Sequence, residues 1–226
     1  MIKVLNIISD TNIGGAGRVI LNYLKYANRD EFDTFVALPK GSLLIGPLNE
    51  SGVKVIEVDG IADKSFDKAD ISKLEKVIKD IKPDIVHTHG SLSGRIAAKK
   101  CKVKIVYTRH SVFPLSWKIK YFPGKLVNKL VNEYYSDRII AVSPAAKDNL
   151  TDGGISGNKI TTIMNGVSPV EKLGVEEVAK VKTSYGINDD EFVMLLLARI
   201  EEYKGHLSVV EAAKKLKEDG RKFNSN

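Results

Sequence analysis

Short apolar runs alternate with amphipathic stretches along most of the chain. The first run, 2–8, is rich in β-branched residues and leads through a glycine-rich turn into apolar residues at helical spacing. Further runs predict strands at 34–38, 53–58, 84–87, 103–108, 138–142 and 159–164. Helical patterns stand between them, near 19–27, 43–50, 71–81, 91–100, 121–135 and 144–152. Strands that alternate with helices predict an α/β fold with a Rossmann-like, doubly wound parallel sheet.

The pattern changes at Ser168, where polar and charged residues begin. We expect a first domain over 1–168, a linker with a short helix over 169–190, and a new βα unit over 191–226. That unit would consist of a strand at 192–197 and a helix at 207–217. A single βα unit cannot bury its own apolar face. The expectation is therefore a second, partial Rossmann-like domain and a truncated protein.

Composition narrows the class of protein. The chain has 226 residues, a formal net charge of +7 and one cysteine, Cys101, so it forms no internal disulfide. The apolar start is too short for a signal peptide, and no run approaches the ~20 apolar residues of a membrane span. These features predict a cytoplasmic protein. The basic balance suits anionic ligands such as nucleotides, and the sequence carries no nucleic-acid-binding motif.

The glycine-rich turn at 12–17 is a candidate phosphate or sugar contact. Its backbone N–H groups open a helix after a strand, which favours an anion, and glycine permits close approach. A dinucleotide fingerprint fails because Ile20 stands at its last glycine position. A P-loop fails because Arg18-Val19 replace its Lys-Ser/Thr pair. A tight turn without a ligand fits the spacing equally well.

Three histidines follow neighbouring strands of the predicted sheet. His87 and His89 share a strand face, and His110 follows the next strand. Three protein ligands are the usual number at a catalytic zinc site, but we favour hydrogen bonds from one or two of these side chains to a substrate or loop. Spacing alone also fits His110 as a loop residue paired with backbone.

Arg199 and Lys204 flank the loop after the strand expected at 192–197. Two cations there could stabilise a departing diphosphate. Charge pattern alone favours a solvated loop, because Glu201 and Glu202 offset the positive charge.

The motifs, taken in order, resemble the GT-B-fold retaining glycosyltransferases of family 4, also called glycosyl transferase group 1. The resemblance rests on Gly14-Gly15-Ala16, Asp84–Gly90, Thr108-Arg109-His110, Asp137–Ser143, Lys159–Val167, and Arg199 with Lys204-Gly205-His206 and Glu211-Ala212.

This resemblance implies an acceptor-side first domain and a donor-binding second domain. It places Gly15, Arg199 and Lys204 at the donor diphosphate and makes His110, beside the transferred sugar, the catalytic candidate. Further candidate substrate contacts are Gly14, His89 and Asn165. The family needs no metal and no cofactor beyond its nucleotide-sugar donor.

The expected reaction moves a hexose from a nucleotide-diphosphate sugar to a glycan or lipid-linked acceptor, with retention of configuration, in polysaccharide biosynthesis. Two departures matter: Gly17 stands where the family often has Glu, and the family's paired glutamates lie beyond this sequence. We therefore expect weak or no activity from this chain alone. The alternative is a non-catalytic acceptor-binding module from a truncated gene, and a dehydrogenase is a distant third.

The segment 115–125 mixes aromatic residues with lysines. Such a segment can rest on an anionic membrane or meet a lipid-linked acceptor. It is thus a candidate peripheral membrane contact at the inner face. Pro123-Gly124 interrupt its apolar periodicity, which favours a loop covering the acceptor side.

Overall fold

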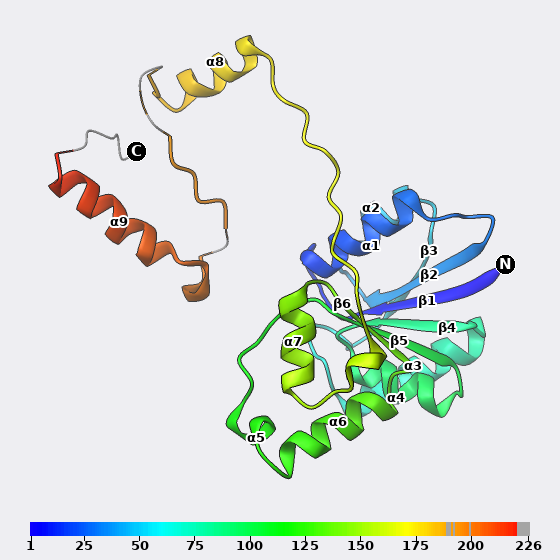
Figure 1. Ribbon diagram of the computed structural model, residues 1–226. Helices are drawn as coiled ribbons and strands as arrows, with labels where there is room; N and C mark the ends of the chain where they lie inside the picture. Colours follow the sequence, from blue (N-terminus) through cyan, green and yellow to red (C-terminus); the bar gives the residue numbers. More distant parts are fainter. Residues whose placement is uncertain (189–190, 192, 199, 221–226) are drawn as a thin grey trace. The chain divides into compact units, whose positions relative to one another are not determined.

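The computed structural model describes residues 1–188, 191, 193–198 and 200–220 (Figure 1). The chain divides into two compact units, Met1–Ser168 and Pro169–Asn226.

The first unit is built on a seven-stranded parallel sheet, counted over the described residues. The strand order is β3-β2-β1-β4-β5-β6-β7, so the sheet grows in both directions from β1 and β4. This confirms the predicted α/β fold with a Rossmann-like parallel sheet. The strands are β1 Ile2–Ile8, β2 Phe32–Pro39, β3 Lys54–Val58, β4 Ile85–His89, β5 Lys104–Arg109, β6 Arg138–Ala141 and β7 Ile160–Thr162.

Two helices cover one face of the sheet at its β1–β3 half. Helix α1, Gly15–Tyr26, presents Ile20 and Leu24 to the sheet, and α2, Ile45–Glu50, adds Leu48. These side chains pack against a buried cluster from β1 and β2. Burial of such apolar side chains contributes roughly 1.5–3 kcal/mol each.

Three helices cover the opposite face of the sheet, from β1 to β7. Helices α3, Lys68–Ile81, and α4, Leu92–Lys100, pack on β1, β4 and β5 through Leu74, Ile78 and Ala97. Helix α7, Pro144–Asp152, covers β6 and β7 through Ala146 and Leu150. The first face over β4–β6 therefore receives no helix from the described part of the first unit.

Helix starts in this unit follow ordinary capping chemistry. The side chains of Asp67, Ser91 and Ser143 accept hydrogen bonds from backbone N–H groups at the starts of α3, α4 and α7. The helix expected over 121–135 is α6, Gly124–Tyr134, and a short additional helix, α5 Trp117–Lys120, precedes it. Pro123 explains the break between the two, because it lacks the N–H that a continuous helix requires.

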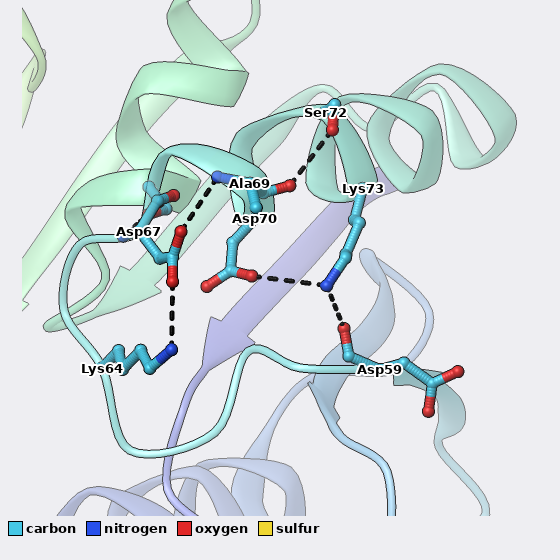
Figure 2. A network of polar contacts seen from close by, with 8 residues as sticks. Asp59, Lys64, Asp67, Ala69, Asp70, Ser72 and Lys73 are labelled. Carbon is cyan, nitrogen blue, oxygen red and sulfur yellow. Dashed lines mark hydrogen bonds and ion pairs between the residues drawn. The ribbon is translucent and has the colours of Figure 1, made fainter.

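A network of polar contacts fixes the loop between β3 and α3 (Figure 2). Lys64 Nζ lies 3.0 Å from Asp67 Oδ2, while Asp67 Oδ1 accepts from the Ala69 N–H at 3.0 Å. Lys73 Nζ donates to the Asp59 carbonyl at 2.8 Å and lies 3.6 Å from Asp70 Oδ1. The loop is thereby held at both ends.

The second unit contains helices in its described residues. They are α8 Val175–Ser184, a 3-10 turn Glu202–Lys204 and α9 His206–Glu218. The prediction of a strand at 192–197 is wrong for residues 193–197, which form no strand in this structure. Phe192 lies outside the described residues. A strand is defined by hydrogen bonds to a neighbouring strand, and the described residues of this unit offer none.

Candidate active site

An apolar cavity of about 730 Å³ lies on the sheet face that α1 leaves open. Its floor comes from alternate residues of neighbouring strands, since successive side chains of a strand point to opposite faces. Its walls include Val19 and Tyr23 of α1 and the segment 163–167. The Asn22 amide ties the two walls together, because Nδ2 donates to the Gly166 carbonyl at 2.9 Å. The floor residues are Val4, Asn6, Ile85, His87, His89, Val106, Thr108, Ile140 and Val142.

The three predicted histidines come together at the carboxyl ends of β4 and β5, and two of them, His87 and His89, line the cavity. His89 Nδ1 lies 2.8 Å from His110 Nε2, and His89 Nε2 lies 3.2 Å from Asn6 Oδ1. His87 Nε2 lies 2.7 Å from Thr108 Oγ1. The strand register explains part of the grouping, because β1, β4 and β5 are neighbours and pair Asn6 with His87 and His89 with Thr108. His110 follows β5 directly.

Burial keeps these imidazoles neutral. It lowers the pKa of His87 to about 4, with the neighbouring His110 as a second cause. Burial also lowers the pKa of His110 to about 4 and that of His89 well below its usual 6.5. Neutral imidazoles donate through one nitrogen and accept through the other, so they suit hydrogen bonding to hydroxyl groups.

Four of the six imidazole nitrogens have hydrogen-bond partners: His89 Nδ1 and His110 Nε2 pair with each other, His89 Nε2 pairs with Asn6, and His87 Nε2 pairs with Thr108. No group of three or more histidine, cysteine, aspartate or glutamate side chains with metal-holding geometry occurs among the described residues.

The glycine-rich turn opens α1 at the carboxyl end of β1. Gly14 is the N-cap, and its position offers no side-chain cap. A Cβ added at Gly15 would meet no atom within 4 Å, so the fold does not require glycine there. A Cβ at Gly17 would lie 2.8 and 2.9 Å from the two terminal methyls of Leu44. The glycine at 17 is thus explained by packing, and the glycine at 15 is not.

Two carboxylates beside the turn were not recognised from the sequence. Asp10 Oδ2 lies at Gly14, where an added Cβ would approach it to 3.4 Å. Burial raises the pKa of Asp10, and the nearby Asp63 raises it further. Asp63 accepts from Thr11 through the backbone N–H at 3.1 Å and through Oγ1 at 2.7 Å. From the sequence, Asp10 could have been recognised only by its position two residues after the buried strand β1.

The remaining predicted site residues belong to both units. Asn165 is in the cavity wall, on the same cavity as His89. Lys204 is exposed at the end of the 3-10 turn in the second unit. Arg199 lies outside the described residues. The roles expected of these residues stay predictions.

The aromatic and basic segment is exposed. Trp117 is 72% exposed and Phe122 is 83% exposed, and no side chain of α5 or α6 is buried. The apolar stripe of α6 also faces outward through Leu126, Leu130 and Tyr134. None of the helices in the described part of the chain has the length and apolar character that crossing a membrane demands.

Comparison with known proteins adds a family match. The model of Glycosyltransferase Family 4 matches residues 13–171, which is more than half of the chain. The chain is similar to an alpha-galactosylglucosyldiacylglycerol synthase of Streptococcus pneumoniae, at 25% identity over 87% of this chain and 56% of that protein.

The chain is also 27% identical to a UDP-Gal:alpha-D-GlcNAc-diphosphoundecaprenol alpha-1,3-galactosyltransferase of Escherichia coli, over 94% of this chain and 57% of that protein. Among solved structures, a glycosyltransferase from Rickettsia africae matches with a TM-score of 0.77 and 25% identity, over 98% of this chain and 59% of that one. The chain thus spans less than two thirds of each of these proteins.

Proposed function

Because this chain belongs to Glycosyltransferase Family 4, we propose that the protein transfers a hexose from a nucleotide-diphosphate sugar to a glycan or a lipid-linked acceptor. The observation that carries the proposal is the juxtaposition of strand ends in the first unit. Neighbouring strands β1 and β4 end at the glycine-rich turn and at His89, and β5 ends just before His110. Ligands of open parallel sheets bind at such carboxyl ends.

The glycine-rich turn supplies the donor contact in this proposal. The first N–H groups of α1 have no partner within the helix and favour a negative ligand. Gly15 presents bare backbone where the fold tolerates a side chain. Close approach by a diphosphate would explain why position 15 is a glycine, which packing within the fold does not explain.

The chemistry follows from charge development. As the glycosyl bond breaks, negative charge grows on the leaving diphosphate, and fixed cations stabilise it without a metal. We assign this role to Arg199 and Lys204. We place His110 beside the transferred sugar and assign retention of configuration to the reaction.

Two features of the first unit support the proposed binding of a glycan or lipid-linked acceptor. A carboxylate accepts hydrogen bonds from sugar hydroxyls, and Asp10 stands at the mouth of the glycine-rich turn. The exposed aromatic and basic segment of α5 and α6 suits contact with the anionic inner face of a membrane. Two relatives have names that include a diacylglycerol or an undecaprenol group, which supports a lipid-linked acceptor.

The test measures donor binding and transfer. UDP-, GDP- and ADP-sugars are screened by thermal shift, and transfer by the whole gene product is then followed with the best donor. Lys204→Ala and Arg199→Ala should each abolish most turnover, while Lys215→Ala on α9 serves as a matched control for lost charge.

Turnover at the unsubstituted rate in both variants would remove the electrostatic role. The configuration of the product's anomeric proton, read by NMR, tests retention. Acceptor binding without any turnover would instead support a non-catalytic binding module.

A further inference from the structure

One hydrogen-bonded chain links three polar side chains, Asn6 of β1, His89 of β4 and His110 just after β5. Asn6 Oδ1 contacts His89 Nε2 at 3.2 Å, and His89 Nδ1 contacts His110 Nε2 at 2.8 Å. Asn6 is 2% exposed and His89 is 6% exposed. An asparagine in the middle of an otherwise apolar strand costs desolvation, so its presence calls for a role.

The orientation of the Asn6 amide decides where each proton of this chain lies. In this structure the amide oxygen faces His89 Nε2, and because an amide oxygen only accepts hydrogen bonds, this orientation places the proton of His89 on Nε2. His89 is neutral, because burial lowers its pKa well below 6.5, and its Nδ1 therefore carries a lone pair. That lone pair must accept from the Nε2–H of His110. His110 is neutral as well, which leaves its Nδ1 bare.

The outer end of this chain is unsatisfied. Among the described residues, Nδ1 of His110 is buried and has no hydrogen-bond partner. The Nδ2 group of Asn6 at the inner end is likewise unpaired in the described structure. Buried polar groups of native proteins are nearly always paired, and exceptions often mark binding or catalytic groups. A network that only supported the fold would be expected to satisfy both of its ends.

We propose that Asn6 and His89 are positioning residues that hold His110 in its Nε2–H form, so that His110 Nδ1 accepts a hydrogen bond from a sugar hydroxyl. This inference rests on the proposed function for the identity of the ligand. It makes the site selective for a donating group. A sugar hydroxyl donates a hydrogen bond to the lone pair of His110 Nδ1. A fluorine at the same carbon cannot donate, and its partial negative charge is repelled by that lone pair.

The tautomer can be observed directly by NMR. The chain is labelled with ¹⁵N-histidine, and two-bond ¹⁵N–¹H correlations identify which ring nitrogen carries the proton. Substitution of each histidine by glutamine, one at a time, assigns the signals. We expect His89 and His110 both to show the Nε2–H pattern in the unliganded chain at neutral pH. An Nδ1–H pattern at His110 would overturn the inference without any variant being needed.

The Asn6→Leu substitution tests the role of the inner end. It keeps the side-chain size but removes the acceptor oxygen, so His89 is no longer forced to carry its proton on Nε2. We expect His110 to lose its single tautomer. Thr108→Val is the matched control, because it removes a buried hydrogen bond from the neighbouring His87 and leaves the chain of three intact. A single Nε2–H pattern at His110 in a folded Asn6→Leu variant would contradict the proposal.

A binding measurement links the tautomer to the ligand. The donor sugar is compared with analogues in which one hydroxyl is replaced by fluorine. The unsubstituted protein should prefer one particular hydroxyl by roughly tenfold, and Asn6→Leu should lose that preference. Equal binding of all the analogues by the unsubstituted protein would overturn the assignment of Nδ1.

The two proposals can fail separately. A protein that binds no nucleotide sugar would refute the proposed function, whereas the tautomer is read without ligand.

Discussion

The substitution Gly15→Ala separates the demands of the fold from those of the ligand. No atom lies within 4 Å of the position that the new methyl group would take. Gly15 is the first residue of α1, where alanine adopts the backbone conformation without strain. A glycine-to-alanine change at a compatible position stabilises a protein by about 0.4–1 kcal/mol, because the unfolded chain loses freedom. For a chain of this size the melting temperature should rise by about 1–4 °C.

Donor binding should move in the opposite direction. The methyl group would occupy space that the proposed diphosphate needs beside the first N–H groups of α1. Loss of one hydrogen bond to a charged group costs about 1.5–3 kcal/mol. That corresponds to a dissociation constant higher by roughly ten- to hundredfold. Isothermal titration with the best nucleotide sugar measures this change, and a thermal melt of the same preparation measures stability.

Gly17→Ala is the matched control, two residues along the same helix. Its new methyl group would lie within 3 Å of both terminal carbons of Leu44, which is fully buried. Overpacking costs about 1–3 kcal/mol, and the gain in helix propensity returns about 1 kcal/mol. This variant should melt lower.

Unchanged donor affinity in Gly15→Ala would refute the placement of the diphosphate. A lower melting temperature for Gly15→Ala would show that the fold needs this glycine after all.

Three further predictions concern stability. Lowering the pH from 7 to 5 should destabilise the protein by about 2 kcal/mol for each of His87 and His110, because the unfolded histidines take up protons near pH 6.5 while the folded ones stay neutral to about pH 4. Urea denaturation should show a shallower pH dependence in His87→Gln, and an unchanged slope would contradict the buried neutral state. Asp10→Asn should raise the urea midpoint at neutral pH, since it removes a partly buried charge beside Asp63, and it should also slow transfer; a lower midpoint would show that the charge stabilises the fold. Asp67→Ala should cost about 1 kcal/mol in the same assay through the lost cap of α3, and no loss would mean that the network of Figure 2 does not hold the loop.

The sheet of the first unit could be predicted from local sequence. Apolar runs and helical periodicity located each of its strands, and the period of two predicted that His87 and His89 share a face. The short helix α5 was not predicted, and α6 begins at Gly124, after Pro123, rather than at residue 121. The strand expected at 192–197 failed in its described residues because apolar character alone does not supply a neighbouring strand.

The polar part of the site was harder to predict, because it depends on contacts between distant residues. The Asp63 side chain contacts Thr11 from a loop 52 residues away. Asp63 itself has a left-handed backbone, with φ of 49°. Asn6 was hidden in an apolar run, and its role depends on His89, 83 residues later. No local pattern encodes such pairings.

Amide hydrogen exchange gives the most direct test of where the donor binds. Exchange is compared with and without the nucleotide sugar that stabilises the chain most. The account predicts slower exchange at the first turn of α1, from Gly15 to Val19, and at His110 after β5. Unchanged exchange at both segments, with saturating ligand, would contradict the placement of the sugar nucleotide in this unit.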